Sequence, residues 1–88
     1  MYWVYVLQNT EDTSWYTGYT ADLKRRIAEH QSGTGCQTTS RKEGWKLIYC
    51  EGYIHQKDAE GRERYLKSGA GRIYLKKQMR HYLNIAKP

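Results

Sequence analysis

The segment YWVYVLQ at residues 2–8 constrains the fold most, because it is rich in β-branched and aromatic residues and apolar on both faces. Side chains of an extended chain alternate between the two faces of a sheet. Trp3, Tyr5 and Leu7 therefore lie on one face, and Tyr2, Val4 and Val6 lie on the other. A strand with two apolar faces is typical of the interior of a sheet. The sequence thus predicts that residues 2–8 form a central strand.

The residues that follow predict a hairpin and a helix. Turn-forming residues at 9–14 precede a second strand at 15–19. Gly18 inside that strand indicates a β-bulge or a close approach of another group to the backbone. Thr20 is suited to be the N-cap of a helix that runs to about Gln31.

The rest of the chain predicts one more strand and two more helices. A polar and basic loop at 36–44 leads to a third strand at 45–53. Helices follow at about 56–67 and 72–85, separated by the glycine-rich segment 68–71. The order ββαβαα predicts an α/β fold, with a small, three-stranded, mostly antiparallel sheet flanked by three helices. At 88 residues the chain has the length of one domain, so we expect residues 1–88 to form a single domain.

Positive charge is concentrated in the C-terminal third of the chain. Residues 1–61 hold seven Lys or Arg and eight Asp or Glu, whereas residues 62–88 hold eight Lys or Arg and one acid, Glu63. In the last predicted helix Leu75, Met79 and Tyr82 recur at the spacing of a packing face, and Lys76, Lys77 and Arg80 lie on the opposite side. A solvated helix and a nucleic-acid-binding surface explain this charge equally well.

The cysteines and the hydropathy pattern bear on where the protein works. Cys36 and Cys50 have neither the spacing of a metal site nor that of a disulfide framework. The first 20 residues contain no Lys or Arg, unlike a signal peptide, and no apolar run approaches the roughly 20 residues that span a bilayer. We therefore expect a soluble, cytoplasmic protein with free thiols and no membrane partner.

The first helix places polar residues at the edge of its buried side. Arg26 and His30 lie within about 60° of Leu23 on a helical wheel, whereas Arg25 points nearly the opposite way. Each residue also has a purely structural explanation. Arg26 suits an arginine whose stem covers the core, and His30 suits a hydrogen-bonded histidine at a helix end.

Glu63 is an acid on the apolar side of the second helix. It shares that side with Ala59 and Leu66, where an unpaired carboxylate would be strongly destabilising. An ion pair with Arg26 or Lys67 would satisfy it. A divalent metal ion would satisfy it as well, and Mg²⁺ suits a single carboxylate because it keeps several of its waters and binds substrate phosphate.

Four segments taken together resemble the GIY-YIG nuclease superfamily. They are Val4–Leu7, Trp15–Thr20, Asp22–His30 and Arg62–Arg72, and they occur in the order and spacing of that family over nearly the whole chain. The last segment is similar to that of small, stand-alone bacterial members. Those members resemble the N-terminal catalytic domain of the incision subunit of nucleotide excision repair.

The resemblance matches six residues to functional positions of the family. Tyr5 matches the tyrosine of the first name-giving motif, and Tyr16 and Gly18 match the tyrosine and glycine of the second. Arg26 matches the catalytic arginine, His30 matches the histidine four residues after it, and Glu63 matches the metal-binding glutamate. The first motif reads Trp-Val-Tyr and the second Tyr-Thr-Gly, so both keep their tyrosines. Gly61 lies inside the predicted second helix, where a helix-forming residue would be expected, and we expect it to loosen the turn that carries Glu63. Asn84 lies too late in the chain to match the asparagine of some branches.

The resemblance also implies a mechanism. Glu63 would hold one Mg²⁺ or Mn²⁺ ion, and Arg26 would stabilise charge on the scissile phosphate. A tyrosine, Tyr5 in preference to Tyr16, would take a proton from the attacking water. His30 would hold a phosphate or pass a proton.

The implied function is that of a divalent-metal-dependent endonuclease that hydrolyses a DNA phosphodiester, in DNA repair or recombination. We expect DNA in preference to RNA, with flanking phosphates bound by Lys67, Arg72, Lys76, Lys77 and Arg80. Specificity would come from the shape of the nucleic acid or from a protein partner. Two alternatives stay open: a nucleic-acid-binding module of the same fold with little or no cutting activity, and an interaction domain in which Glu63 is only salt-bridged.

Overall fold

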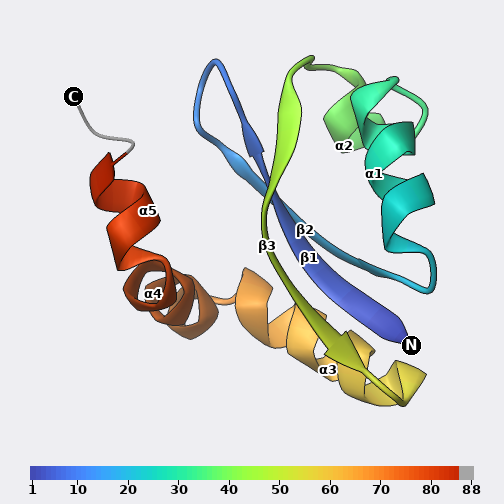
Figure 1. Ribbon diagram of the computed structural model, residues 1–88, viewed down its shortest axis with the longest axis vertical. Helices are drawn as coiled ribbons and strands as arrows, with labels where there is room; N and C mark the ends of the chain where they lie inside the picture. Colours follow the sequence, from blue (N-terminus) through green and yellow to red (C-terminus); the bar gives the residue numbers. More distant parts are fainter. Residues whose placement is uncertain (86–88) are drawn as a thin grey trace.

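A sheet of three antiparallel strands forms the centre of the protein, seen here in a computed structural model that describes residues 1–85 (Figure 1). Strand β1 (Tyr2–Asn9) lies in the middle, between β2 (Trp15–Thr20) and β3 (Trp45–Tyr53). The predicted central strand, hairpin and third strand are therefore confirmed, as is the α/β class. Lys87, part of the basic C-terminal third, lies outside the described residues.

Helices cover both faces of the sheet. Over residues 1–85 they are α1 (Leu23–Gln31), α2 (Gln37–Ser40), α3 (Gln56–Lys67), α4 (Gly69–Gln78) and α5 (Arg80–Ile85). Helices α1 and α2 lie on one side of the sheet, and α3, α4 and α5 lie on the other (Figure 1). No helix in this part of the chain is long and apolar enough to cross a membrane.

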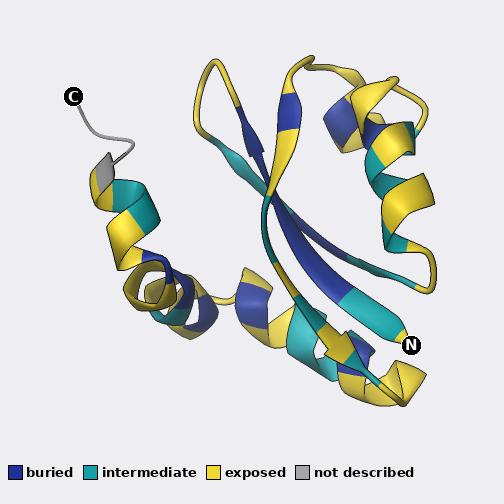
Figure 2. Ribbon diagram, viewed as in Figure 1, coloured by how far each residue is buried: buried dark blue, intermediate teal, exposed yellow. Residues whose placement is uncertain are grey.

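The two faces of β1 build two separate cores. Val4 and Val6 pack with α3 and α4 through a set of buried side chains that comprises Ala59, Leu66, Leu75 and Met79. Tyr5, Leu7 and Trp45 form the other core, against which Tyr16 and residues of α1 pack. Figure 2 shows β1 as the most continuously buried segment of the protein. The alternation that predicts a central strand thus also explains the two layers of helices.

Helix α1 begins later than the sequence predicted. Its N-cap is Asp22, whose carboxylate accepts a hydrogen bond from the backbone N–H of Arg25 at 3.1 Å. Thr20 was expected in that position but instead accepts a bond from the backbone N–H of Asp22, also at 3.1 Å. An aspartate is at least as good an N-cap as a threonine, and two such residues only two positions apart leave the sequence signal ambiguous.

The expected β-bulge at Gly18 is wrong, and the alternative of a close approach is confirmed. Gly18 pairs with Tyr5 in an unbroken β1–β2 register. The irregularity of the sheet lies instead on the β3 side of β1, between Val6 and Leu7. A Cβ atom on Gly18 would lie only 2.6 Å from the Tyr5 hydroxyl oxygen, so the glycine makes room for a side chain.

The helical C-terminal region differs in detail from the prediction. The expected third helix at 72–85 is two helices, because Met79 leaves the helical conformation, although it still accepts a backbone bond from Leu83. The expected break at 68–71 is confined to Ser68, which caps α4 through a bond from the N–H of Gly71. Gly71 lies inside α4, where a Cβ would be 1.9 Å from the Tyr65 carbonyl oxygen of α3. It therefore serves close helix packing and does not end a helix.

The segment at 36–44, expected to be a loop, contains the single helical turn α2. Its residue Thr39 is fully buried beneath α1. The indole N–H of Trp45 donates to the backbone carbonyl of Thr39 at 3.0 Å. These contacts are made across the fold, which explains why the local sequence does not predict the turn.

Candidate active site

Tyr5 lies at the centre of a polar cluster on the α1 side of the sheet. The residue is 1% exposed, and its ring extends across β2 over the backbone of Gly18. Its hydroxyl group forms a 2.8 Å hydrogen bond with Nε2 of His30, which is also 1% exposed. The first motif tyrosine and the histidine of α1 are therefore in direct contact.

His30 is held from its other side by Thr39. Nδ1 of His30 lies 2.7 Å from Oγ1 of Thr39, and that hydroxyl also lies 3.4 Å from both the backbone carbonyl oxygen and Sγ of Cys36. A hydroxyl has one proton, so when Thr39 donates to either group of Cys36 it accepts the Nδ1–H bond of His30. This pattern assigns an unprotonated Nε2 that accepts the Tyr5 O–H bond. A chain of hydrogen bonds thus runs from Tyr5 through His30 to Thr39.

Burial controls the ionisation of this pair. Desolvation lowers the pKa of His30 below its ordinary 6.5, and the positive charge of Arg26 lowers it further. Burial also raises the pKa of the Tyr5 hydroxyl, against a lowering by the nearby Arg26, with smaller raising effects from Cys36 and Glu63. Both groups are therefore neutral in the resting protein at neutral pH.

Tyr16 is the more exposed of the two motif tyrosines. Its ring centroid lies 6.4 Å from that of Tyr5 and 4.9 Å from that of His30. Burial and a hydrogen bond to Cys36 raise its pKa. Burial would raise the pKa of the Cys36 thiol, but hydrogen bonds from Thr39, Tyr16 and backbone N–H groups outweigh it and lower that pKa to about 7.

The two arginines of α1 differ as the helical phase predicts. The side chain of Arg25 is 75% exposed, whereas that of Arg26 is 30% exposed. Both contact Glu29, Arg25 through Nε at 3.2 Å and Arg26 through a terminal nitrogen at 3.0 Å. The charge of Arg26 also acts on Tyr5, so Arg26 places a fixed cation beside the cluster.

Glu63 lies on α3 with 17% of its side chain exposed. One of its oxygens is 2.8 Å from Nζ of Lys67, one helical turn further along. Of the two partners that the sequence suggested for Glu63, Lys67 therefore forms the ion pair, and Arg26 pairs with Glu29. Among the described residues no three His, Cys, Asp or Glu side chains gather into a metal-ligating group.

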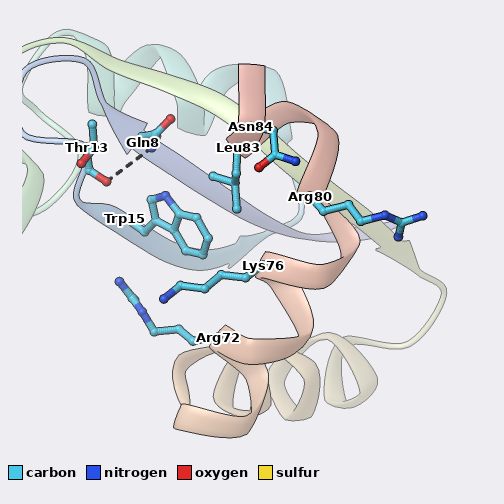
Figure 3. Close-up of a pocket in the computed structure, with 8 residues that line it drawn as sticks. All are labelled: Gln8, Thr13, Trp15, Arg72, Lys76, Arg80, Leu83 and Asn84. Atoms are coloured by element: carbon cyan, nitrogen blue, oxygen red, sulfur yellow. Dashed lines mark hydrogen bonds between the residues drawn. The ribbon is translucent and has the colours of Figure 1, made fainter. Parts of the chain in front are cut away.

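The predicted phosphate-binding residues do not form one patch. Arg72, Lys76 and Arg80 line a groove on the other face of the sheet, around the indole of Trp15 (Figure 3). Lys77 is exposed but does not line this groove, and Lys67 forms an ion pair with Glu63. Lys77 therefore lies outside the groove that Lys76 and Arg80 line, and its contact with phosphate stays a prediction.

Comparison with known proteins identifies the family. The family model described as the GIY-YIG catalytic domain matches residues 1–78. The chain belongs to the GIY-YIG family. This is a nuclease superfamily, and GIY-YIG nucleases act on nucleic acids.

Small proteins of the same kind are similar to this GIY-YIG domain. A UPF0213 protein of Streptococcus pneumoniae serotype 4 is 42% identical over 65 residues, which cover 74% of this chain and 65% of the relative. A UPF0213 protein of Clostridium perfringens is 39% identical, over 76% of this chain and 71% of the relative. The chain thus spans just under two thirds of the length of the Streptococcus relative.

A solved structure supports the fold. The solution NMR structure of a UPF0213 protein from Bacillus halodurans is 35% identical and superposes with a TM-score of 0.52, covering 85% of this chain and 82% of that one. The chain is therefore a small GIY-YIG member with the fold of that structure.

The GIY-YIG domain gathers most of the predicted site residues. Tyr5, Tyr16, Arg26 and His30 lie together on the α1 side, whereas Glu63 belongs to α3, on the other side of the sheet, and its charge contributes only a small rise to the pKa of the Tyr5 hydroxyl. Sequence reasoning missed Thr39, which fixes His30 from a segment that was expected to be a polar loop. A threonine in such a segment carries no local signal, so only the tertiary structure reveals it.

Proposed function

We propose that this GIY-YIG domain is a divalent-metal-dependent endonuclease that hydrolyses a DNA phosphodiester, in DNA repair or recombination. The observation that carries the proposal is the buried 2.8 Å hydrogen bond between Tyr5 and His30, with the Arg26 cation beside it. A buried phenol bonded to a neutral imidazole is a device for moving a proton. The family membership supplies the class of substrate.

In the proposed reaction Tyr5 takes a proton from the attacking water while it gives its own proton to His30. A free phenol has a pKa near 10, so as an isolated group it is a poor base at neutral pH. Transfer to Nε2 of His30 removes the need for a standing phenolate. Thr39 accepts from Nδ1–H and so keeps Nε2 available as the acceptor. Tyr16, the more exposed tyrosine, orients the water or the phosphate.

Arg26 would stabilise charge on the phosphate. A guanidinium offers several N–H donors and suits phosphate oxygens. Its present partner is Glu29, which Arg25 also holds. Arg26 can therefore turn to a phosphate without leaving Glu29 unpaired. Charge that develops on the non-bridging oxygens would then be neutralised from the α1 side.

The residues fit a metal ion that is held mainly by water and phosphate. Glu63 supplies one partly desolvated carboxylate, and the described part of the chain adds no further acidic ligand beside it. Mg²⁺ commonly binds through one or two carboxylates and substrate phosphate, and Mn²⁺ favours similar oxygen ligands. Glu63 would hold the ion, which would polarise the phosphate and stabilise the leaving oxygen. Lys67 would release Glu63 when the ion binds.

The second candidate is a nucleic-acid-binding module without cutting activity. The observation in its favour is the 2.8 Å ion pair between Glu63 and Lys67, which already satisfies the carboxylate. The basic groove around Trp15 serves this candidate as well as the first. Sequence specificity would in either case come from nucleic-acid shape or from a protein partner.

Plasmid nicking tests the proposal with two matched variants. Supercoiled DNA would be incubated with the protein and Mg²⁺, Mn²⁺ or EDTA, and open circles would be counted. We expect metal-dependent nicking that Arg26→Gln reduces about 10²-fold, as for loss of a charge-stabilising donor, and that Arg25→Gln reduces less than about threefold. Both variants remove one charge from α1 beside Glu29. Equal losses, or nicking in EDTA, would contradict the proposed site.

A further inference from the structure

A groove of about 520 Å³ lies on the sheet face opposite Tyr5. Strands β1 and β2 form its floor, and α4 and α5 form its wall. Its lining consists of Gln8, Thr13, Trp15, Arg72, Lys76, Arg80, Leu83 and Asn84. Figure 3 shows the indole of Trp15 in the middle of this set, with the ends of Arg72 and Lys76 beside it. We call this feature the Trp15 groove.

The charge of the Trp15 groove points to an anionic ligand. Three of its lining residues are cations, and none of the described lining residues is an acid. Arg72 and Lys76 lie one turn apart on α4, and their charged ends both lie beside Trp15, whereas the side chain of Arg80, on α5, lines the groove but extends away from the indole (Figure 3). Cations spaced along one wall of a groove match successive phosphates of a strand.

The aromatic ring of Trp15, beside these cations, places a second requirement on the ligand. Trp15 is half-buried, and the Arg72 guanidinium carbon lies 5.2 Å from its ring centroid. An indole can stack on a base only if that base is unpaired, since bases of a duplex are covered by their neighbours. The volume is also within the range of pockets that hold small molecules, and so admits a base with its sugar.

We propose that the Trp15 groove binds a single-stranded segment of nucleic acid, with a base stacked on Trp15 and phosphates on Arg72, Lys76 and Arg80. This inference rests on the proposed function, because it names the form of the nucleic acid that the nuclease holds. Its location is consistent with one continuous substrate. Trp15 and Tyr16 are adjacent on β2, an edge strand, and their side chains belong to the cores on opposite faces. A flexible strand that passes over this edge reaches both the groove and the candidate active site, whereas a stiff duplex does not.

Neighbouring lysines of α4 provide a matched test. Binding of a fluorescent 12-nucleotide oligo(dT) would be followed by anisotropy in EDTA, which prevents cutting. Lys76→Gln should weaken binding by at least about threefold and reduce the salt dependence by about 0.7 in log–log slope, the value for one phosphate contact to a single strand. Lys77→Gln removes the same charge outside the groove and should have a clearly smaller effect. Equal effects of the two variants would overturn the groove and indicate diffuse attraction.

The stacking claim is tested with the ligand as well as with the protein. A 12-nucleotide abasic oligonucleotide keeps the phosphates and lacks the bases, so the wild type should bind it at least about fivefold more weakly than oligo(dT). Trp15→Tyr should keep this preference, and Trp15→Leu should lose it. Thermal unfolding would verify that both variants are folded. Equal affinity of the wild type for the two oligonucleotides, or tighter binding of a 12-base-pair duplex, would overturn the proposal.

The outcomes separate this inference from the proposed function. A comparison of the affinities for oligo(dT) and oligo(U) identifies whether the groove prefers a DNA strand or an RNA strand. Groove-dependent binding without metal-dependent nicking would support the groove and reject the nuclease. Metal-dependent nicking together with equal effects of Lys76→Gln and Lys77→Gln would support the nuclease and reject the groove.

Discussion

Single residues show how the candidate site depends on burial. His30 is neutral because burial, aided by the charge of Arg26, holds its pKa below 6.5. The unfolded chain therefore binds more protons than the folded one between that lowered pKa and 6.5. The contribution of His30 to stability is complete above pH 6.5 and is lost as the pH falls through the folded pKa.

We expect the free energy of unfolding to decrease from pH 6.5 to pH 5, above the range in which carboxylates titrate. Urea unfolding at several pH values would measure this decrease. In His30→Gln the slope between these pH values should become nearly flat, even though the variant is less stable overall. An unchanged slope in that variant would show that another group causes the acid sensitivity.

Gly18 controls the position of the Tyr5 hydroxyl. In Gly18→Ala the new methyl group would lie 2.6 Å from that oxygen, so Tyr5 must move. We expect a loss of about 1–3 kcal/mol in stability, typical of overpacking, together with loss of nicking. Chemical denaturation and the plasmid assay measure the two effects.

Gly61→Ala is the matched control, because no atom lies within 4 Å of the added Cβ. It should stabilise the protein by roughly 0.5–1 kcal/mol, since alanine favours the helix more than glycine does. If Gly18→Ala were as well tolerated as Gly61→Ala, the packing of Tyr5 across β2 would be wrong.

Helical phase was the part of the site that the sequence predicted best. It distinguished Arg26 from Arg25 and placed Glu63 on the packed side of α3, as the structure confirms. Helical phase did not decide whether Arg26 or Lys67 pairs with Glu63, because the sequence does not give the distance between side chains of different helices. Thr39 escaped prediction altogether, since its bond to His30 joins two segments by tertiary contact alone.

At the scale of elements, the junction of α3 and α4 depends on a close approach of two helices. Gly71 of α4 lies against the last turn of α3. A Cβ atom added at Gly71 would lie 1.9 Å from the Tyr65 carbonyl oxygen and 2.6 Å from Cα of Leu66. Backbone atoms cannot move aside as a flexible side chain can. The packing of α4, and with it one wall of the Trp15 groove, therefore requires glycine at this position.

We expect Gly71→Ala to destabilise the protein by at least about 2 kcal/mol and to weaken oligonucleotide binding, because α4 must shift. Gly69→Ala is the control two residues earlier on the same helix, where no atom lies within 4 Å of the added Cβ. It should leave stability within about 0.5 kcal/mol of the wild type or raise it. Denaturant midpoints and anisotropy measure both variants. Equal stability of the two would contradict the helix packing.

The strands were predicted nearly to the residue, and the helices less well. Apolar residues on both faces of an extended segment predict β1, and the turn-forming residues at 9–14 predict the hairpin, because both signals are local. The start of α1, the turn α2 and the division between α4 and α5 depend on competing caps or on contacts across the fold. Glycines in segment 68–71 were misjudged because a glycine that permits close packing and one that ends a helix look alike in a sequence.

For the whole molecule, the sheet lies between the candidate active site and the Trp15 groove, and the edge strand β2 contributes Tyr16 to the first and Trp15 to the second. The Tyr5–His30 pair and Arg26 lie on the α1 side, and the Trp15 groove lies on the side of α3, α4 and α5. The excess positive charge of the C-terminal third thus contributes to the groove face. In the proposed function, the proton-transfer residues and Arg26 belong to the α1 layer, whereas the metal ligand Glu63 and the Trp15 groove belong to the layer of α3, α4 and α5.

The proposed metal site joins the two layers, because Glu63 belongs to α3 but its charge acts on Tyr5. Its most direct test is metal-dependent nicking by Glu63→Gln beside Glu60→Gln, which changes another half-buried acid of α3, the partner of Tyr19. Supercoiled plasmid would be titrated with Mg²⁺ and Mn²⁺ for the wild type and both variants. The proposal predicts a loss of at least about 10²-fold for Glu63→Gln and near wild-type nicking for Glu60→Gln. Undiminished, metal-dependent nicking by Glu63→Gln would contradict the assignment of the metal to Glu63.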